Sequence, residues 1–330
     1  MTVIALDAMG GDLGPAATVG GALLAAAEGF DVALVGDETV LRAEIARRGP
    51  VPARISVVHA PDVVEMGDKG AAGVRTHRET SMYVGAELVK SGRAQALVSI
   101  GNTGAMMATA LVVLGRLRGV ERPALGAVLP GGPHGVLLLD VGANADARAS
   151  QLLQFARLGS AYMHAMYAVA TPRIALLSIG EEPSKGSSLV IETHQLLAAA
   201  TDLRFIGNIE SRDLVSGQAD VIVTDGFTGN VALKLAEGLV QLLFNSVRDA
   251  ARASFLGRLG GALLLPSLRG VRARLDYRQY GAAPLLGVNG VVLIGHGRSD
   301  EQAVASSIRS AHRAAEEGML AALAAVVREA

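Results

Sequence analysis

The chain has no cysteine and no tryptophan, and aromatic residues make up only 3% of its 330 positions. The absence of cysteine excludes disulfides, thiolate zinc sites and acyl-cysteine intermediates, and it fits a reducing compartment. So few aromatic rings leave little surface for stacking nucleic-acid bases. A formal net charge of −1 also lacks the basic field that bulk nucleic-acid binding requires. We therefore expect no nucleic-acid partner.

Several familiar sequence patterns are also missing. The seven histidines form no H-x-x-H or H-E-x-x-H pattern, so we expect no bound metal. There is no Walker loop, no G-x-G-x-x-G after a strand and no G-x-S-x-G elbow. The start Met1-Thr2-Val3-Ile4 has no basic leader, and no apolar run reaches about 18 residues, so we expect neither a signal peptide nor a transmembrane helix.

The chain does repeat one order of elements: a short apolar strand, a glycine-rich turn and an amphipathic helix. Strands are expected at 3–9, 31–35, 54–60, 96–101, 136–141, 174–179, 219–224 and 291–295, and helices at 15–28, 38–48, 105–118, 147–167 and 299–317. Strands rich in Val, Ile and Leu that alternate with helices predict a parallel sheet covered on both faces. We therefore expect a three-layer α/β/α fold with a mostly parallel sheet. Without a polar linker, residues 1–330 should form a single two-lobed unit.

Four strand-to-helix turns combine glycines with carboxylates, amides or hydroxyls, and ligands of parallel sheets bind beyond the carboxyl ends of strands. Two of them, 101–104 and 226–229, share the sequence Gly-x-Thr-Gly. Helix N-termini with such residues favour anions. An ordinary helix cap would explain one such turn, but two predict a phosphate or other oxyanion site. The candidate residues are Asp7, Gly10, Gly11, Asp12, Gly101, Asn102, Thr103, Gly104, Asp140, Asn144, Asp225, Gly226, Thr228, Gly229 and Asn230.

Few lysines accompany these turns, because 26 of the 30 basic residues are Arg. Lys185 follows the strand at 174–179, and Lys234 lies one turn into the helix after the second Gly-x-Thr-Gly. A compact ammonium group suits phosphate; a solvated surface position is the alternative for each. Arg122 is a similar candidate. His296, between two glycines after the last strand, is a candidate for catalysis or for a structural role.

Residues 248–278 differ from the rest of the chain. They carry seven Arg and two Asp, a local charge of +5 in a chain of −1. Arginines interleaved with apolar residues suit a helical excursion that touches anionic lipid or an acidic protein; a helix pair packed at a dimer interface is the alternative. The candidate contacts are Arg252, Phe255, Leu256, Arg258, Leu259, Leu263, Leu264, Leu265, Arg269 and Arg272.

Together these motifs resemble one family. Residues 5–12, 101–105, 122–125, 140–144, 224–230 and 280–290 are similar, in order and over nearly the whole chain, to the bacterial phosphate acyltransferases of phospholipid synthesis. Ile100 departs from the pattern, since the family usually has Ala there. The last motif adds Asn289 to the candidate substrate-binding residues.

The resemblance implies transfer of a long-chain acyl group from acyl-carrier-protein thioester to inorganic phosphate. A membrane acyltransferase would then use the acyl phosphate on glycerol 3-phosphate. The resemblance also implies the fold of phosphotransacetylase and the isocitrate/isopropylmalate dehydrogenases. It further implies a cytoplasmic homodimer, peripherally attached to the membrane, without metal or nucleotide cofactor.

Within that reaction we expect the two Gly-x-Thr-Gly turns to cradle phosphate and the carbonyl oxyanion through Asn102, Thr103, Thr228 and Asn230. Lys185 and Lys234 would neutralise phosphate, and the aspartates would orient cations and turns. His296 would protonate the leaving thiolate. Two alternatives stay open: a phosphotransacetylase-type enzyme acting on short acyl-CoA, and a non-catalytic scaffold at the membrane surface. A dehydrogenase of the related fold is a weaker third.

Overall fold

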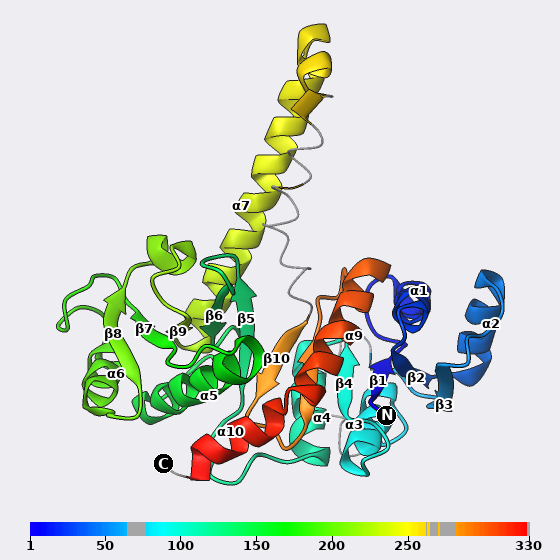
Figure 1. Cartoon of the computed structure of the whole chain (residues 1–330), viewed down its shortest axis with the longest axis horizontal. Helices are drawn as coiled ribbons and strands as arrows, with labels where there is room; N and C mark the ends of the chain where they lie inside the picture. The colour runs from blue at the N-terminus through cyan, green and yellow to red at the C-terminus, as the bar shows by residue number, and fades with distance from the viewer. Residues whose placement is uncertain (65–76, 262, 265–269, 271–281, 329–330) are drawn as a thin grey trace.

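The computed structural model describes residues 1–64, 77–261, 263–264, 270 and 282–328 (Figure 1). The strands of this part are β1 (Val3–Asp7), β2 (Asp31–Gly36), β3 (Ile55–His59), β4 (Ala96–Ser99), β5 (Ala124–Leu129), β6 (Val136–Leu139), β7 (Arg173–Leu177), β8 (Arg204–Ile209), β9 (Val221–Val223), β10 (Ala283–Leu286) and β11 (Val291–Ile294). The helices are α1 (Gly14–Ala27), α2 (Glu38–Arg48), α3 (Ser81–Lys90), α4 (Thr103–Val113), α5 (Ala149–Tyr167), α6 (Ser188–Ala199), η1 (Ser211–Val215), α7 (Gly226–Arg252), α9 (Glu301–Glu316) and α10 (Met319–Arg328).

The strands form one sheet in the order β3-β2-β1-β4-β11-β10-β5-β6-β9-β7-β8. Most neighbours are parallel, as expected, but β11/β10, β10/β5 and β5/β6 are antiparallel. Because of these central reversals, β4 and β11 run in one direction while β6 and β9 run in the opposite direction. The carboxyl ends of the two pairs therefore lie at opposite ends of the strands. β5 and β10, which produce the reversals, are not among the strands expected from the sequence.

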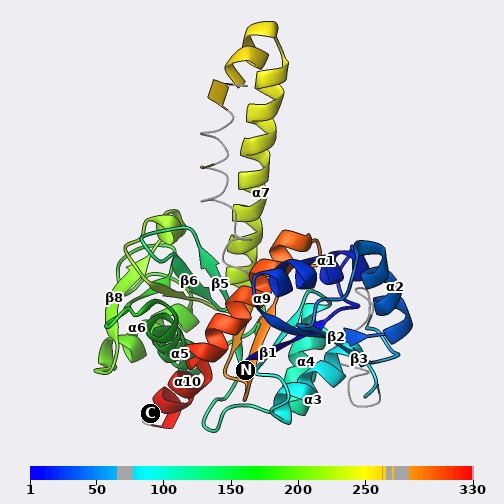
Figure 2. The ribbon, with the colours of Figure 1, turned by 45° about the vertical axis from the view of Figure 1, so that its right-hand side comes forward.

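Two buried apolar clusters lie on the two faces of this sheet. Successive strand residues point to opposite faces, so Ile4 and Leu6 join one cluster while Ala5 joins the other. The first cluster includes residues of α1, α5, α9 and α10. The second includes residues of α3 and α4, and Leu233 at the start of α7 packs against it. The result is the three-layer arrangement predicted from the sequence (Figure 2).

Helix α4 is shorter than the predicted helix 105–118 and begins earlier. The Asn102 side chain accepts a hydrogen bond from the Ala105 N–H (3.0 Å), which sets the start at Thr103. The helix ends before Gly115, whose positive φ of 77° cannot continue a right-handed helix. The end of α4 thus lies beside the start of β5 and the end of β10, where the Leu117 N–H donates to the Gly287 carbonyl.

Helix α7 departs from the layers. Its first turns contact β5 and β6, and the remainder projects from the body of the molecule (Figures 1 and 2). The projection therefore begins before residue 248, where the charge pattern placed the start of the excursion. Residues 255–261 are again helical, whereas the expected contacts Leu265, Arg269 and Arg272 lie outside the described residues. None of the helices in the described ranges has both the length and the apolarity to cross a bilayer.

Candidate active site

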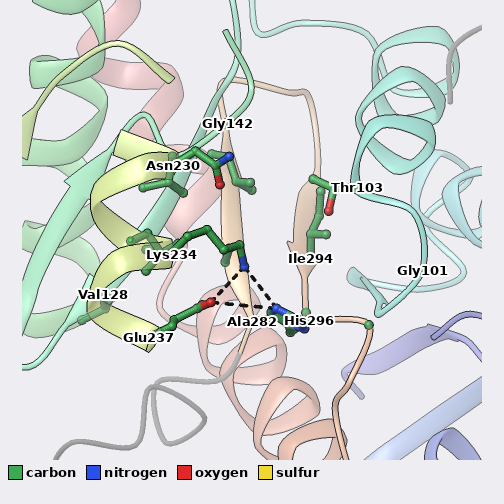
Figure 3. Close-up of a pocket in the computed structure, with 17 residues that line it drawn as sticks. Gly101, Thr103, Val128, Gly142, Asn230, Lys234, Glu237, Ala282, Ile294 and His296 are labelled. Carbon is green, nitrogen blue, oxygen red and sulfur yellow. Dashed lines mark hydrogen bonds and ion pairs between the residues drawn. The ribbon is translucent and has the colours of Figure 1, made fainter. Parts of the chain in front are cut away.

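A cavity of about 420 Å³ lies between α4 and α7, over the strands whose direction reverses (Figure 3). Such reversals are where ligands of α/β sheets bind, and the volume is in the range of small-molecule sites. Three glycine-containing turns reach the cavity, after β4, β6 and β11. Its lining residues are Gly101, Thr103, Leu125, Ala127, Val128, Val141, Gly142, Asn230, Leu233, Lys234, Glu237, Ala282, Ala283, Ile294, Gly295, His296 and Gly297.

The titratable side chains of the cavity gather at one end. Lys234 Nζ lies 2.9 Å from Glu237 Oε2 and 3.1 Å from His296 Nε2. Asn230 and Lys234 are four residues apart and Glu237 follows three later, so one face of α7 presents all three. In Figure 3, Asn230 and Gly142 lie on the opposite side of the cavity from His296. A cation and an amide therefore face each other across a largely apolar pocket.

The surroundings of the His296 imidazole favour its neutral form. Burial lowers its pKa, the Lys234 charge lowers it further, and the Glu237 carboxylate opposes this. Donors also face both ring nitrogens, since the Arg298 backbone N–H lies 3.3 Å from Nδ1. A neutral imidazole has one accepting nitrogen and can accept from one of these donors, whereas a protonated ring could accept from neither. The surroundings of His296 therefore favour its neutral ring more than water does.

The first Gly-x-Thr-Gly turn rests on a buried carboxylate. Asp7 accepts hydrogen bonds from the hydroxyls of Ser81 (2.6 Å) and Ser99 (2.7 Å). Burial raises its pKa, and these bonds oppose the rise. A Cβ at Gly101 would lie 3.3 Å from Asp7 Oδ2 and would displace the end of the Met82 side chain, so the turn packs closely here. Asp7 thus holds the turn that presents Thr103 to the cavity.

Ile100 and the first glycine turn pack against each other. Ile100 is fully buried, and a Cβ at either Gly11 or Gly295 would come within 2.7 Å of its side chain. The Asp12 N–H donates to the Gly297 carbonyl at 2.7 Å. The turns after β1 and β11 therefore meet above Ile100.

The second Gly-x-Thr-Gly turn uses its threonine differently. Asp225 accepts from both the N–H (2.9 Å) and the hydroxyl (2.7 Å) of Thr228. Thr228 is exposed and does not line the cavity. The turn is seated tightly, because a Cβ at Gly229 would lie 1.9 Å from the Asp140 carbonyl oxygen. The side chains that α7 sends into the cavity come from its next turns.

Asp140 organises the wall beside that turn. Its carboxylate accepts from the N–H groups of Leu125 (3.1 Å), Gly142 (3.1 Å), Ala143 (2.9 Å) and Asn144 (2.7 Å), and from Asn144 Nδ2 (2.9 Å). Burial raises its pKa, and these bonds oppose the rise. The carboxylate is therefore fully occupied inside the fold, and it ties β5 to the turn that carries Gly142.

The structure brings five of the predicted residues into this cavity: Gly101, Thr103, Asn230, Lys234 and His296. Asp7, Gly10, Gly11, Asp12, Asn102, Gly104, Asp140, Asn144, Asp225, Gly226, Thr228 and Gly229 belong to the turns around it but do not line it. Glu237 was not predicted, although its spacing of three residues from Lys234 is a usual helical ion-pair spacing.

Three predicted residues lie elsewhere. Lys185 is exposed in the loop after β7, where its N–H donates to the Glu182 carbonyl. Asn289 is in the β10–β11 connection, at the sheet edge opposite His296. Arg122 lines a separate cavity at the start of β5. Across the described ranges, no group of three or more His, Asp and Glu side chains is placed to hold a metal ion.

Comparison with known proteins agrees with this architecture. A solved phosphotransacetylase from Streptococcus pyogenes superposes with a TM-score of 0.66 at 20% identity, covering 96% of this chain and 94% of the other. A 4-hydroxythreonine-4-phosphate dehydrogenase from Klebsiella pneumoniae gives a TM-score of 0.55 at 13% identity, covering 95% and 99%. The predicted relation to the phosphotransacetylase fold is confirmed.

Sequence comparison is more specific. A phosphate acyltransferase from Thermus thermophilus is 52% identical over 318 residues, 96% of each chain. One from Heliobacterium modesticaldum is 46% identical over 322 residues, covering 97% of this chain and 96% of the relative. A sequence model of the family described as "Fatty acid synthesis protein" matches residues 2–322. The chain belongs to this family, together with the phosphate acyltransferases.

Proposed function

We propose that the protein transfers a long-chain acyl group from the thioester of acyl-carrier protein to inorganic phosphate, releasing an acyl phosphate for phospholipid synthesis. The names of its relatives support acyl transfer to phosphate. The observation that carries the proposal is the cavity itself, where the Lys234 ammonium, the Asn230 amide and the Thr103 hydroxyl surround an apolar pocket.

The chemistry needs no covalent enzyme intermediate. Phosphate is largely dianionic at neutral pH, since phosphoryl groups have a second pKa of about 6, and one of its oxygens attacks the thioester carbonyl. The carbon–sulfur bond then breaks and the thiol leaves as thiolate, with a pKa of roughly 8.5 by analogy with cysteine. Holding the two reactants together supplies up to about 7–11 kcal/mol, so positioning and charge neutralisation are the main tasks of the protein.

Lys234 is the residue to which we assign phosphate binding in the cavity. Glu237 and His296 hold its ammonium from two sides at 2.9 and 3.1 Å. We assign His296 the role of positioning Lys234 instead of protonating the thiolate, because its lowered pKa leaves it neutral. Thr103 and Asn230 supply the donors for the oxyanion or for phosphate, a contribution of about 1.5 kcal/mol for one such donor.

The segment that follows α7 supports peripheral attachment to anionic lipid or to acyl-carrier protein. Phe255 (80% exposed), Leu256 (77%) and Leu263 (75%) present large apolar side chains to solvent, with Arg252 and Arg258 close by in the sequence. Exposed apolar residues beside arginine suit an interfacial segment. Leu264→Glu should release the protein from phosphatidylglycerol vesicles, whereas Val215→Glu, at an equally exposed site on the body, should not.

The projecting part of α7 supports a homodimer. Apolar side chains recur along it at steps of four residues and are exposed at Val231, Leu235, Leu239, Leu243 and Val247. A stripe of this kind on a lone helix is the usual face for pairing with another helix. A second copy of the chain would cover it, which analytical ultracentrifugation of Leu239→Glu against the unmodified protein would test.

The decisive experiment is direct. Palmitoyl-carrier protein and inorganic phosphate are incubated with the protein, and acyl phosphate is trapped as the hydroxamate with hydroxylamine. Phosphate-dependent hydroxamate is expected. Product from acetyl-CoA alone would instead favour a phosphotransacetylase-type activity, and no product from either donor would leave a non-catalytic scaffold.

A further inference from the structure

A second cavity, separate from the candidate active site, lies beside the start of β5 and contains three arginines. It has a volume of about 510 Å³ and is lined by Leu111, Arg116, Glu121, Arg122, Pro123 and Arg148. All three arginines are exposed. With Glu121 as its one acidic lining residue, the cavity carries a formal charge of +2 in a chain of −1. This concentration of positive charge is not explained by the reaction site.

The partners of these arginines leave one guanidinium uncommitted. Arg148 Nη2 pairs with Glu121 Oε2 at 2.9 Å, and Arg116 donates to the Glu121 carbonyl. Arg122 makes no hydrogen bond or ion pair with any residue that the structure describes. A guanidinium suits bidentate binding of a phosphate group. The cavity therefore contains a free anion-binding side chain next to two further positive charges.

Shared walls connect this cavity to the active site. Pro123 in the arginine cavity directly precedes β5, and Leu125 and Ala127 of that strand line the active site. On α4, Thr103 and Leu111 lie eight residues apart, close to one face of the helix and about 12 Å along its axis. The two cavities are therefore neighbours along α4 and β5, at a separation that a short chain molecule can span.

The side chains between the two cavities are apolar, which limits the kind of ligand that can lie along them. Leu125 is buried, and Met107 and Leu111 are partly buried against the same apolar cluster. An amide- and methylene-rich chain ending in a thioester at one end and a phosphate at the other fits such a path. Pantetheine arms have this composition, both on carrier proteins and in coenzyme A.

Resting on the proposed function, we infer that Arg116, Arg122 and Arg148 bind the phosphate of the pantetheine arm of the acyl donor. The thioester then enters the active site from the α4–β5 side, and the Lys234–His296 end stays available to inorganic phosphate. This surface lies apart from the tip of α7, where the charge pattern alone places the carrier protein.

The test compares donors with and without that phosphate. In Arg122→Gln, KM for decanoyl-carrier protein and for decanoyl-CoA should both rise about tenfold, with kcat unchanged. KM for decanoyl-N-acetylcysteamine, which lacks the phosphate, and KM for inorganic phosphate should stay as in the unmodified protein. Arg47→Gln, an exposed arginine on α2, is the matched control and should change none of these values.

Other outcomes overturn the proposal. An equal rise for all three donors would mean that Arg122 acts on the active site itself, and a rise for the carrier protein alone would mean that it contacts the protein surface of the carrier. Calorimetry separates this question from activity: 4′-phosphopantetheine should bind the unmodified protein more tightly than pantetheine, and Arg122→Gln should remove the difference. If both compounds bind alike, the inference fails even where acyl phosphate is formed; if no acyl phosphate forms while the difference persists, the proposed function fails instead.

Discussion

The two Gly-x-Thr-Gly turns share one sequence pattern, but their threonines occupy different positions in the helices that follow. In the first, the cap Asn102 lies inside the motif, so Thr103 is the first residue of α4. In the second, the cap Asp225 precedes the motif, so Thr228 is the third residue of α7. Two positions rotate a helical side chain by about 200°. The comparison teaches that such a motif predicts where a helix begins but not which of its side chains faces the ligand.

The largest effect is expected where the second turn's helix supplies charge. Lys234→Met should lower kcat/KM for phosphate about 100- to 1000-fold, because it removes the cation from the cavity. Steady-state kinetics with hydroxylamine trapping would measure this. Lys185→Met is the matched variant, since Lys185 lies outside the cavity, and we expect it to be nearly unaffected. Equal losses in both would restore the sequence-based expectation that the two lysines act together.

The final glycines of the two turns give a sharper contrast in stability. Gly229→Ala should lower the free energy of unfolding by about 1–3 kcal/mol or more and abolish most activity. The reason is that the new Cβ would lie 1.9 Å from the Asp140 carbonyl oxygen. Gly104→Ala has only Asn102 Oδ1 nearby, at 3.4 Å, and should be neutral or slightly stabilising. Chemical denaturation of both variants measures the difference; similar unfolding free energies would show that the turns are seated alike.

A smaller effect is expected from the threonines themselves. Thr103→Val should reduce kcat about tenfold, the loss of one hydrogen bond of about 1.4 kcal/mol. Thr228→Val should reduce it less than about threefold, because its hydroxyl bonds to Asp225 and does not reach the cavity. Both are measured with saturating acyl donor and phosphate. A larger loss for Thr228→Val would reverse the assignment of the two turns.

The smallest expected effect is a shift in the pKa of His296. Lys234→Met removes a positive charge and should raise the pKa of His296 toward its ordinary value, whereas Glu237→Gln should lower it further. In the unmodified protein the lowered pKa favours the neutral ring. The stability that depends on neutral His296 is therefore present above the ordinary pKa of histidine, and it declines as the pH falls through the lower pKa of the folded protein. Titration of the imidazole signals by nuclear magnetic resonance measures each shift, and shifts of the same sign would contradict the geometry.

Sequence patterns predict the fold class but not the two central strands β5 and β10. Outer strands such as β1 and β2 are Val- and Leu-rich runs followed by recognisable helices, so periodicity locates them. β5 and β10 pair antiparallel between two parallel sets, and their short apolar runs carry no turn signal for this pairing. The same gap limits the site: Lys234 and His296 are predictable one at a time, but their 3.1 Å contact depends on how α7 packs against β5 and β6.

Helix α7 runs without interruption from its Asp225 cap to Arg252. At 1.5 Å per residue, Lys234 and Arg252 are about 27 Å apart along the axis. The helix thus acts as a spacer of set length between the reacting groups and whatever its far end contacts. Removing seven residues would shorten it by about 10 Å yet leave its apolar stripe on the same side, because seven residues make nearly two full turns. Spacer length can therefore be varied while the chemistry of both ends is kept constant.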